Sequence, residues 1–129
     1  MKAYYLFDHL TFVETPARQA LEEILGDEKL GKAWFITADG ITAGYVILAY
    51  GTCVEFHGKT AVIDELFLNE GFRGQGVGPK ILLLLEEFCR TQGVKVMRLE
   101  VEHSNERAKK VYEKAGFQIH ERHLMSRVL

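Results

Sequence analysis

The chain lacks any hydrophobic run long enough to cross a membrane. Its longest aliphatic stretch, Ile81 to Leu85, is far shorter than the roughly 20 apolar residues that a transmembrane helix needs. The N-terminal residues contain no long apolar segment before Asp8, so a secretory leader is not expected. The chain also lacks a large excess of either positive or negative charge: the formal net charge is −2 and no block of like charges occurs. We therefore expect neither a membrane nor a nucleic acid as a partner.

Cysteine and proline are both scarce, with two residues of each. Cys53 and Cys89 form no spacing motif, so we expect free thiols and a cytoplasmic protein. The chain contains no repeat, no low-complexity segment and no proline-rich linker. Its 129 residues are enough for one hydrophobic core but too few for two, so a single domain over residues 1–129 is expected.

Apolar periodicity and turn residues predict strands that alternate with three helices. One helix begins at Thr15-Pro16 and ends at Gly26, because threonine and proline favour a helix start and glycine a helix end. A long helix with Ile81, Leu84, Leu85 and Phe88 on its buried face, widened by Leu82 and Leu83, is predicted to stop near Gly93, and a shorter one covers Asn105 to Ala115. The predicted strands are Tyr4–Leu10, Trp34–Thr37, Ile41–Tyr50 with a continuation over Val54–Phe56, Thr60–Leu68, Val94–Val101, and one or two within Ile119–Val128. This order predicts a mixed α/β or α+β sheet with one parallel, right-handed crossover.

The most informative segment lies between the Thr60–Leu68 strand and the long helix. Glycines stand there at alternate positions, Gly74, Gly76 and Gly78. Such a turn points backbone N–H groups outward with no side chain in front of them, and the dipole of the following helix adds positive potential. The segment is therefore predicted to bind phosphate.

Two familiar phosphate loops fit this segment poorly. A Walker A loop that starts at Gly74 needs glycine where Pro79 stands, and Ile81 replaces the hydroxyl residue that would bind Mg²⁺. A dinucleotide fingerprint also meets Pro79 at its third glycine, although Glu100 lies at a suitable distance for a ribose contact. The dinucleotide loop and a plain strand-to-helix turn are the weaker interpretations. The pattern that fits is Arg73-x-x-Gly76-x-Gly78.

This pattern resembles the acetyl-CoA loop of the GCN5-related N-acetyltransferase (GNAT) superfamily, Gln/Arg-x-x-Gly-x-Gly/Ala. The resemblance extends over residues 60–117, through the strand Ile63-Asp-Glu-Leu-Phe-Leu, the strand Met97-Arg-Leu-Glu-Val, Asn105 and Ala108-x-x-Val-Tyr112-x-x-x-Gly116-Phe117. It implies an α/β (α+β) fold: a mixed, mostly antiparallel twisted sheet with one parallel, splayed strand pair and flanking helices.

The resemblance also implies how acetyl-CoA would bind as co-substrate, with no metal. The pyrophosphate would lie over the backbone of the glycine loop, beginning at Arg73 and continuing through Gly74, Gln75, Gly76, Val77 and Gly78. Backbone groups of Leu66, Phe67 and Leu68 would pair with the pantetheine arm, which Asn105 would also contact. The alternative role of Asn105 is a helix N-cap, and the two roles are compatible. Relatives often carry a small polar or basic residue where this chain has Pro79. Proline has no N–H, so the phosphate contacts are expected to be weaker or redistributed.

For the reaction, the resemblance implies acetyl transfer to a primary amine by direct attack in a ternary complex. Tyr112 is the candidate general acid, and a core tyrosine is the alternative. A backbone N–H within Leu66–Leu68, freed by a local bulge, would stabilise the oxyanion. Glu100 is the first candidate for the general base and Glu65 the second, with Glu102, water or no dedicated base as the other choices.

The sequence leaves the acceptor and the assembly open. A small-molecule amine and an exposed protein amine both fit, with a slight preference for a small or exposed acceptor because no added substrate domain is present. The second functional hypothesis is a non-catalytic acyl-CoA-binding or regulatory module on the same fold. The apolar residues of the last predicted strand could pair between two subunits, which would give a homodimer. His120 and His123 would lie on opposite faces of that strand and so are not expected to bind a metal.

Overall fold

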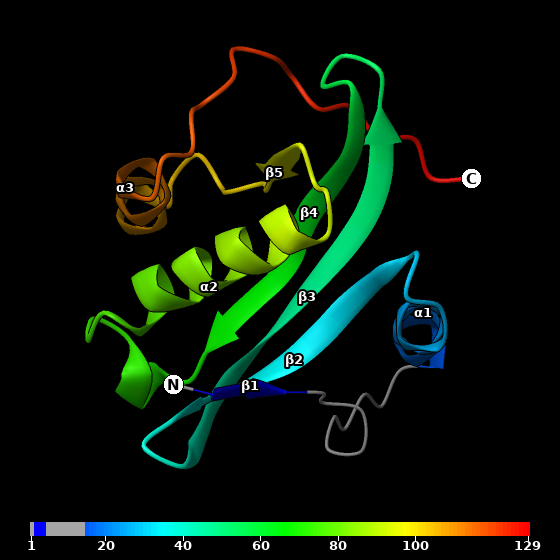
Figure 1. The fold of residues 1–129 in the computed structure, drawn as a ribbon. Coiled ribbons are helices and arrows are strands. Elements are labelled where there is room, and N and C mark those ends of the chain that lie inside the picture. Colours follow the sequence, from blue (N-terminus) through cyan, green and yellow to red (C-terminus); the bar gives the residue numbers. More distant parts are fainter. Residues whose placement is uncertain (1, 5–14) are drawn as a thin grey trace.

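The described residues of the protein form a five-stranded sheet with helices on both of its faces (Figure 1). The structure is a computed structural model that describes residues 2–4 and 15–129. Its elements, in chain order, are β1 (Lys2–Tyr4), α1 (Thr15–Gly26), β2 (Gly31–Ala38), β3 (Ile41–Cys53), β4 (Gly58–Leu68), the short 3₁₀ helix η2 (Glu70–Phe72), α2 (Val77–Thr91), β5 (Val96–Arg98) and α3 (Glu106–Lys114). The strands lie in the order β1-β2-β3-β4-β5, antiparallel except for the parallel pair β4 and β5. The predicted mixed, mostly antiparallel sheet is confirmed.

The hydrophobic core has a part on each face of the sheet. On one face, Leu21 of α1 packs with Ala33 and Ile47 of the central strands. On the other face, α2 covers a larger cluster that includes Val46 and Leu48 of β3. Figure 1 shows α1 and α2 on opposite sides of the sheet. Because successive residues of β3 point to opposite faces, the run Val46-Ile47-Leu48 is buried throughout.

The turn between β2 and β3 lies at Ala38-Asp39-Gly40, a sequence that is itself a hairpin signal between two strands. Asp39 and Gly40 both have positive φ, 52° and 76°, which is the conformation of the two central residues in a type I′ turn. The opposite end of β3 departs from the prediction. Val54–Phe56 does not extend the strand but belongs to the turn that leads into β4, where the His57 N–H donates to the Val54 carbonyl and the Val54 side chain is exposed.

Strands β4 and β5 separate soon after they meet. Their pairing covers Thr60↔Val96, Ala61↔Met97 and Val62↔Arg98, while β4 continues to Leu68 and pairs there, among the described residues, with β3 alone. The edge of β4 from Ile63 to Leu68 that faces away from β3 therefore has no partner strand in the described part of the chain, and we call it the free edge. The predicted splayed pair is confirmed, but β5 is shorter than the predicted strand Val94–Val101.

Helix α2 buries most of its predicted face, including Ile81, but two of its predicted leucines turn outward. The helix lies where it was expected, but its buried leucines are Leu82 and Leu85. Leu84 was predicted to be buried and is 42% exposed, whereas Leu83 is 60% exposed. Phe88 keeps its predicted place against the core, with its ring edge-on to Trp34 at 4.9 Å. The four consecutive leucines Leu82–Leu85 have no internal period, so packing rather than sequence selects the inward pair.

The two ends of the chain differ from the prediction in different ways. At the start, β1 covers Lys2–Tyr4, and the remainder of the predicted strand Tyr4–Leu10 lies outside the described residues. At the other end, no strand forms within Ile119–Val128, and the apolar residues of this segment are exposed. A strand needs a neighbour for its backbone groups, and β5 offers an edge of only three residues. The segment is held by Arg122, whose Nη1 and Nη2 donate to the Glu55 carboxylate at 3.0 and 2.8 Å.

Candidate functional site

The glycine loop joins the end of β4 to the start of α2. Gly74 and Gly76 both adopt the left-handed conformation, with φ of 74° and 81°, which explains why glycine suits these two positions. Gly78 differs, because its φ is not positive and an added Cβ would meet only Leu68, at 3.9 Å. The loop therefore needs two of its three glycines for its backbone conformation.

The loop presents backbone donors without internal partners. Gly76 is the N-cap of α2 and has no side-chain capping hydrogen bond. Within the described chain, none of the N–H groups from Gly74 to Gly78 donates to a backbone or side-chain acceptor. Pro79, in the first turn of α2, lacks an N–H at a position where the helix would not have used one. The N-terminus of α2 is thus an open site for an anion.

Arg73 points back to β4 rather than over the glycines. Its Nε donates to the Leu68 carbonyl at 2.9 Å, and its guanidinium lies 5.6 Å from the centre of the Phe67 ring. Gln75 is also engaged locally, because its side-chain amide donates to the Gly71 carbonyl at 2.7 Å. Both contacts fix the shape of the loop. The predicted contact between Arg73 and a pyrophosphate stays a prediction.

The free edge of β4 exposes backbone groups on the side away from β3. The Phe67 carbonyl lies against Gly44 of β3, so closely that a Cβ on Gly44 would collide with it. Because backbone groups alternate along an extended strand, those of Leu66 and Leu68 point to the free edge. A bulge lies earlier in the strand: Ile47 pairs with Glu65 and Leu48 with Ile63, which leaves Asp64 unmatched. The sequence placed a bulge within Leu66–Leu68, and the structure has it at Asp64.

Glu65 lies on the face of the sheet that α1 covers. The Tyr45 hydroxyl donates to its Oε1 at 3.4 Å, and the Tyr45 ring stacks on Phe67 with centroids 5.7 Å apart. Burial raises the pKa of Tyr45, and the negative charge of Glu65 and its hydrogen bond raise it further. Tyr45 is therefore neutral at physiological pH and acts toward Glu65 as a hydrogen-bond donor. This pair has no signal in the sequence, because its two residues lie on different strands.

Tyr112 lies on α3 and packs into the core on the other face. Its ring is edge-on to Phe117 at 5.9 Å, and burial raises the pKa of Tyr112, so the hydroxyl is protonated at neutral pH. Leu66 and Leu68 pack against the same core cluster. Glu100 follows β5 and is exposed. In the described part of the chain no hydrogen bond joins Tyr112 to Glu100 or Glu65, so the structure does not bring the proposed acid and bases into direct contact.

Asn105 is the N-cap of α3. Its side-chain oxygen accepts a hydrogen bond from the Ala108 N–H at 3.1 Å, so the alternative role predicted for this residue is confirmed. The cap uses the oxygen of the side-chain amide and leaves its nitrogen for other contacts. A contact with a bound ligand remains a prediction.

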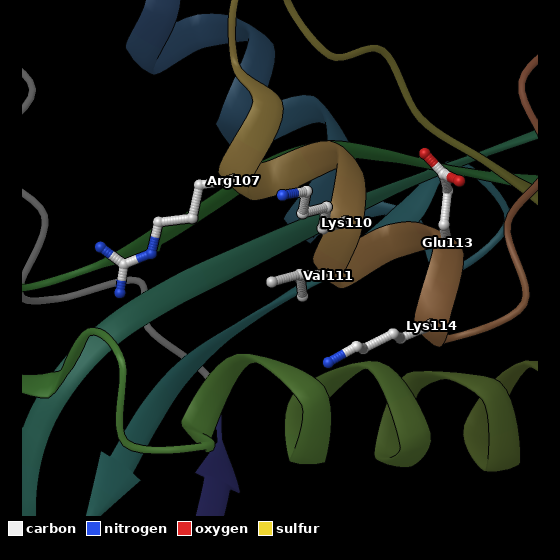
Figure 2. Close-up of a pocket in the computed structure, with 5 residues that line it drawn as sticks. All are labelled: Arg107, Lys110, Val111, Glu113 and Lys114. Carbon is white, nitrogen blue, oxygen red and sulfur yellow. The ribbon is translucent and has the colours of Figure 1, made fainter.

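The basic residues of α3 are the part of the site that the sequence did not reveal. A hollow of about 380 Å³ is lined by Arg107, Lys110, Val111, Glu113 and Lys114 (Figure 2). One guanidinium nitrogen of Arg107 lies 2.8 Å from the position that a Cβ on Gly74 would take. The signal was present in the sequence as Arg107, Lys110 and Lys114, which are spaced for one side of a helix. These three side chains become part of the site only because α3 packs beside the glycine loop, which the sequence does not display.

The described residues contain no group of three or more histidine, cysteine, aspartate or glutamate side chains arranged to hold a metal ion. None of their helices is long and apolar enough to cross a membrane. Both cysteines, Cys53 and Cys89, are free thiols, and Cys89 is buried.

Comparison with known proteins gives a consistent set of similarities. The sequence profile of the acetyltransferase (GNAT) family matches residues 2–117. The chain is 32% identical over 122 residues to a mycothiol acetyltransferase of Propionibacterium freudenreichii, a match that covers 87% of this chain and 38% of the relative. It is 28% identical over 90 residues to the thialysine N-epsilon-acetyltransferase of Bos taurus, covering 67% of this chain and 53% of that protein. The chain thus spans between about a third and a half of these relatives.

Among solved structures, the fold is similar to aminoglycoside N-acetyltransferase AAC(6')-Iy in complex with CoA. The TM-score is 0.77 at 20% identity, and the match covers 99% of both chains. At this level of identity the similarity establishes the fold.

Proposed function

This chain belongs to the acetyltransferase (GNAT) family, and we propose that it transfers the acetyl group of acetyl-CoA to a primary amine. One observation carries the proposal: the free edge of β4 leads directly into a glycine loop whose N–H groups have no protein acceptor in the described chain. A ligand with an extended chain of amides that ends in a pyrophosphate complements both parts: its amides can pair with the strand edge, and its pyrophosphate can accept hydrogen bonds from the loop. CoA, which is bound in the similar AAC(6')-Iy structure, is such a molecule.

The residues present fit this donor. Backbone groups of Leu66 and Leu68 are available to pair with the amides of the pantetheine arm, and the N–H groups of Gly74 to Gly78 are available to the pyrophosphate. Arg73 now holds the Leu68 carbonyl, so pairing along the whole free edge requires this side chain to move. The guanidinium that is released would then be free to reach the phosphates.

When bound, acetyl-CoA supplies an acetyl carbonyl activated as a thioester. The protein's own contribution would be to place the amine, to remove its proton and to protonate the departing sulfur. Tyr112 is suited to the last step, because burial keeps its hydroxyl protonated at neutral pH. A backbone N–H of the Leu66–Leu68 segment would donate to the carbonyl oxygen as negative charge develops there.

The general base remains a choice between carboxylates. Glu65 has support from its hydrogen bond with Tyr45, which holds the carboxylate at the point where β4 leaves β5. Glu100 follows the end of β5, on the other side of the gap between these two strands, and is exposed. We keep both candidates. Replacing each by glutamine separately and comparing the acidic limbs of the two pH–rate profiles distinguishes them.

We propose a small molecule as the acceptor. The relatives and the similar structure are named for mycothiol, thialysine and an aminoglycoside, all of which are small molecules. The exposed Phe67 ring and the Glu65 carboxylate beside it offer an apolar and an anionic contact for the body of such an amine. This arrangement favours an acceptor that carries positive charge.

The experiment is an acceptor screen with acetyl-CoA that follows the release of free thiol. The panel contains small polyamines, amino acids, aminoglycosides and peptides with a free N-terminus. We expect turnover with at least one small amine and stabilisation of the fold by acetyl-CoA alone. Acetyl-CoA binding without turnover across this panel would instead support the non-catalytic acyl-CoA-binding module. Absence of acetyl-CoA binding would refute both functions.

A further inference from the structure

Three aromatic side chains form a row across the sheet that ends at the free edge of β4. Phe35 of β2 pairs in register with Tyr45 of β3, and Tyr45 pairs with Phe67 of β4. Because residues opposite each other on adjacent strands share a face, the three rings lie on the face that α1 covers, where Tyr45 packs against the smaller core cluster. Exposure increases toward the free edge: Phe35 is 8% exposed and Phe67 is 42% exposed. The row therefore ends in an accessible ring at the edge assigned to the donor.

A carboxylate stands beside this accessible ring. Glu65 lies two residues before Phe67, so the two side chains share a face of β4. Tyr45 contacts both residues, because its ring stacks on Phe67 and its hydroxyl donates to Glu65 Oε1 at 3.4 Å. In the described part of the chain, Glu65 is exposed and forms no ion pair. An aromatic ring and a carboxylate held together in this way offer a cation two favourable contacts.

The protein places one of its own cations against the Phe67 ring. The Arg73 guanidinium lies 5.6 Å from the centre of this ring, within the range of a cation–π contact, while its Nε donates to the Leu68 carbonyl. Under the proposed function, Arg73 leaves that carbonyl when the pantetheine arm pairs with the free edge. The same movement withdraws the guanidinium from Phe67. A ring that holds a cation in the free protein is then open to a second cation while the donor is bound.

Resting on the proposed function, we infer that the acceptor carries a second cationic group, which does not react, and that Glu65 and Phe67 bind this group. The reacting amine has to be neutral when it attacks, so the charge that is recognised belongs to another part of the acceptor. Tyr45 is a positioning residue, because it fixes the carboxylate of Glu65 relative to the ring of Phe67. Glu65 thus anchors the acceptor, and removal of the amine proton is left to Glu100 or water. The substrate class is a diamine, or an amine that also carries a guanidinium group.

The test compares amines that differ in the second charge, at saturating acetyl-CoA, by the release of free thiol. Putrescine and pentylamine form one matched pair, because an ammonium group of the diamine takes the place of a methyl group of the monoamine. Cadaverine and hexylamine form a longer pair, and agmatine carries a guanidinium group. We expect kcat/KM for the better diamine to be about tenfold higher than for its matched monoamine, the size expected for a cation–π contact together with an exposed ion pair. The difference should lie in KM.

Three variants locate the contact. Glu65→Gln keeps the shape of the side chain and an oxygen for the Tyr45 hydroxyl but removes the charge, so it should raise the KM of the diamine about fivefold and leave the monoamine unaffected. Asp64→Asn makes the same change of charge one residue earlier and should keep the preference for the diamine. Tyr45→Phe keeps the stacked ring without the hydroxyl and should raise the KM of the diamine about threefold at unchanged kcat. Melting temperatures and acetyl-CoA affinities at the wild-type values establish that each variant is folded.

The outcomes separate this inference from the proposed function. Equal kcat/KM for the diamines and their matched monoamines, or turnover only of amines without a second cation, overturns the inference and leaves the proposed function standing. An equal fall of kcat with both classes of amine in Glu65→Gln also overturns it, because Glu65 would then be the general base. A preference that survives in Glu65→Gln, or that Asp64→Asn removes equally well, shows that Glu65 is not the anchor. Absence of turnover with every amine of the acceptor panel refutes the proposed function and the inference with it.

Discussion

Two neighbouring leucines of α2 provide a matched test of how the helix is oriented. Leu82 is 3% exposed and packs in the main core, whereas Leu83 is 60% exposed. Replacing each by alanine makes the same chemical change, with the same small gain in helix propensity, one residue apart on one helix. Any difference in stability therefore reports burial.

The expected cost of Leu82→Ala follows from its burial. The substitution removes roughly three methylene equivalents, which are worth about 2.4 kcal/mol in transfer free energy. The cavity left behind raises the total to about 3 kcal/mol, within the range known for buried leucine. An entropy of unfolding of about 2.1 cal/mol/K per residue gives roughly 0.27 kcal/mol/K for 129 residues, so the melting temperature should fall by about 11 °C. Leu83→Ala should change the free energy of unfolding by no more than about 0.5 kcal/mol.

The assay is thermal and urea unfolding followed by circular dichroism, with the transition shown to be two-state before free energies are compared. Similar losses for the two variants, or a larger loss for Leu83→Ala, would refute the orientation of α2.

Other predictions concern the loop, the acid and the C-terminal contact. Gly76→Ala should cost about 1–2 kcal/mol in unfolding free energy, because alanine is strained at φ 81°. Gly78→Ala, the matched control, should leave urea unfolding nearly unchanged. Equal losses for the two variants would contradict the loop conformation. Tyr112→Phe should lower kcat by about 10²-fold without weakening acetyl-CoA binding, and full turnover would refute its role as the acid. Since burial raises the pKa of Tyr112, the alkaline limb of the wild-type pH–rate profile that reports this acid should lie above the pH at which an ordinary tyrosine loses its proton. Arg122 holds the pKa of Glu55 below its usual range, so the ion pair between them persists at neutral pH and is lost only as the pH falls through that lowered pKa. Glu55→Gln removes the ion pair at pH 7 and should speed tryptic cleavage after Arg122. An unchanged cleavage rate would contradict the anchoring role of this contact.

The elements that the sequence predicted well are those with a clear local period or a defined turn. The strand Thr60–Leu68, the hairpin at Asp39-Gly40 and the cap at Asn105 each depend on residues close together in the chain. The predictions failed where a distant neighbour decides the outcome. Residues 118–129 have an apolar pattern that suits a strand, but β5 is too short to pair with them. On α2, Leu83 and Leu84 were wrongly assigned to the buried face for the related reason that packing chooses among consecutive leucines.

In the candidate site too, features that a local motif encodes were predicted, whereas contacts between distant elements were not. The left-handed glycines Gly74 and Gly76 and the open N-terminus of α2 follow from a local motif, which the sequence displays directly. The contact of Arg107 with the loop, and that of Tyr45 with Glu65, require elements that are far apart in the chain to pack together. Such contacts have no local signature, so a single sequence can name the residues without showing that they meet.

The free edge of β4 also bears on how the protein behaves at high concentration. An unpaired strand edge can pair with the same edge of a second molecule, which is a common origin of aggregation. Here the edge is next to the like-charged Asp64 and Glu65, and Arg73 already covers the Leu68 carbonyl. Edge-to-edge association would bring two pairs of carboxylates together. Salt screens that repulsion, so association should increase with ionic strength and decrease when a ligand covers the edge.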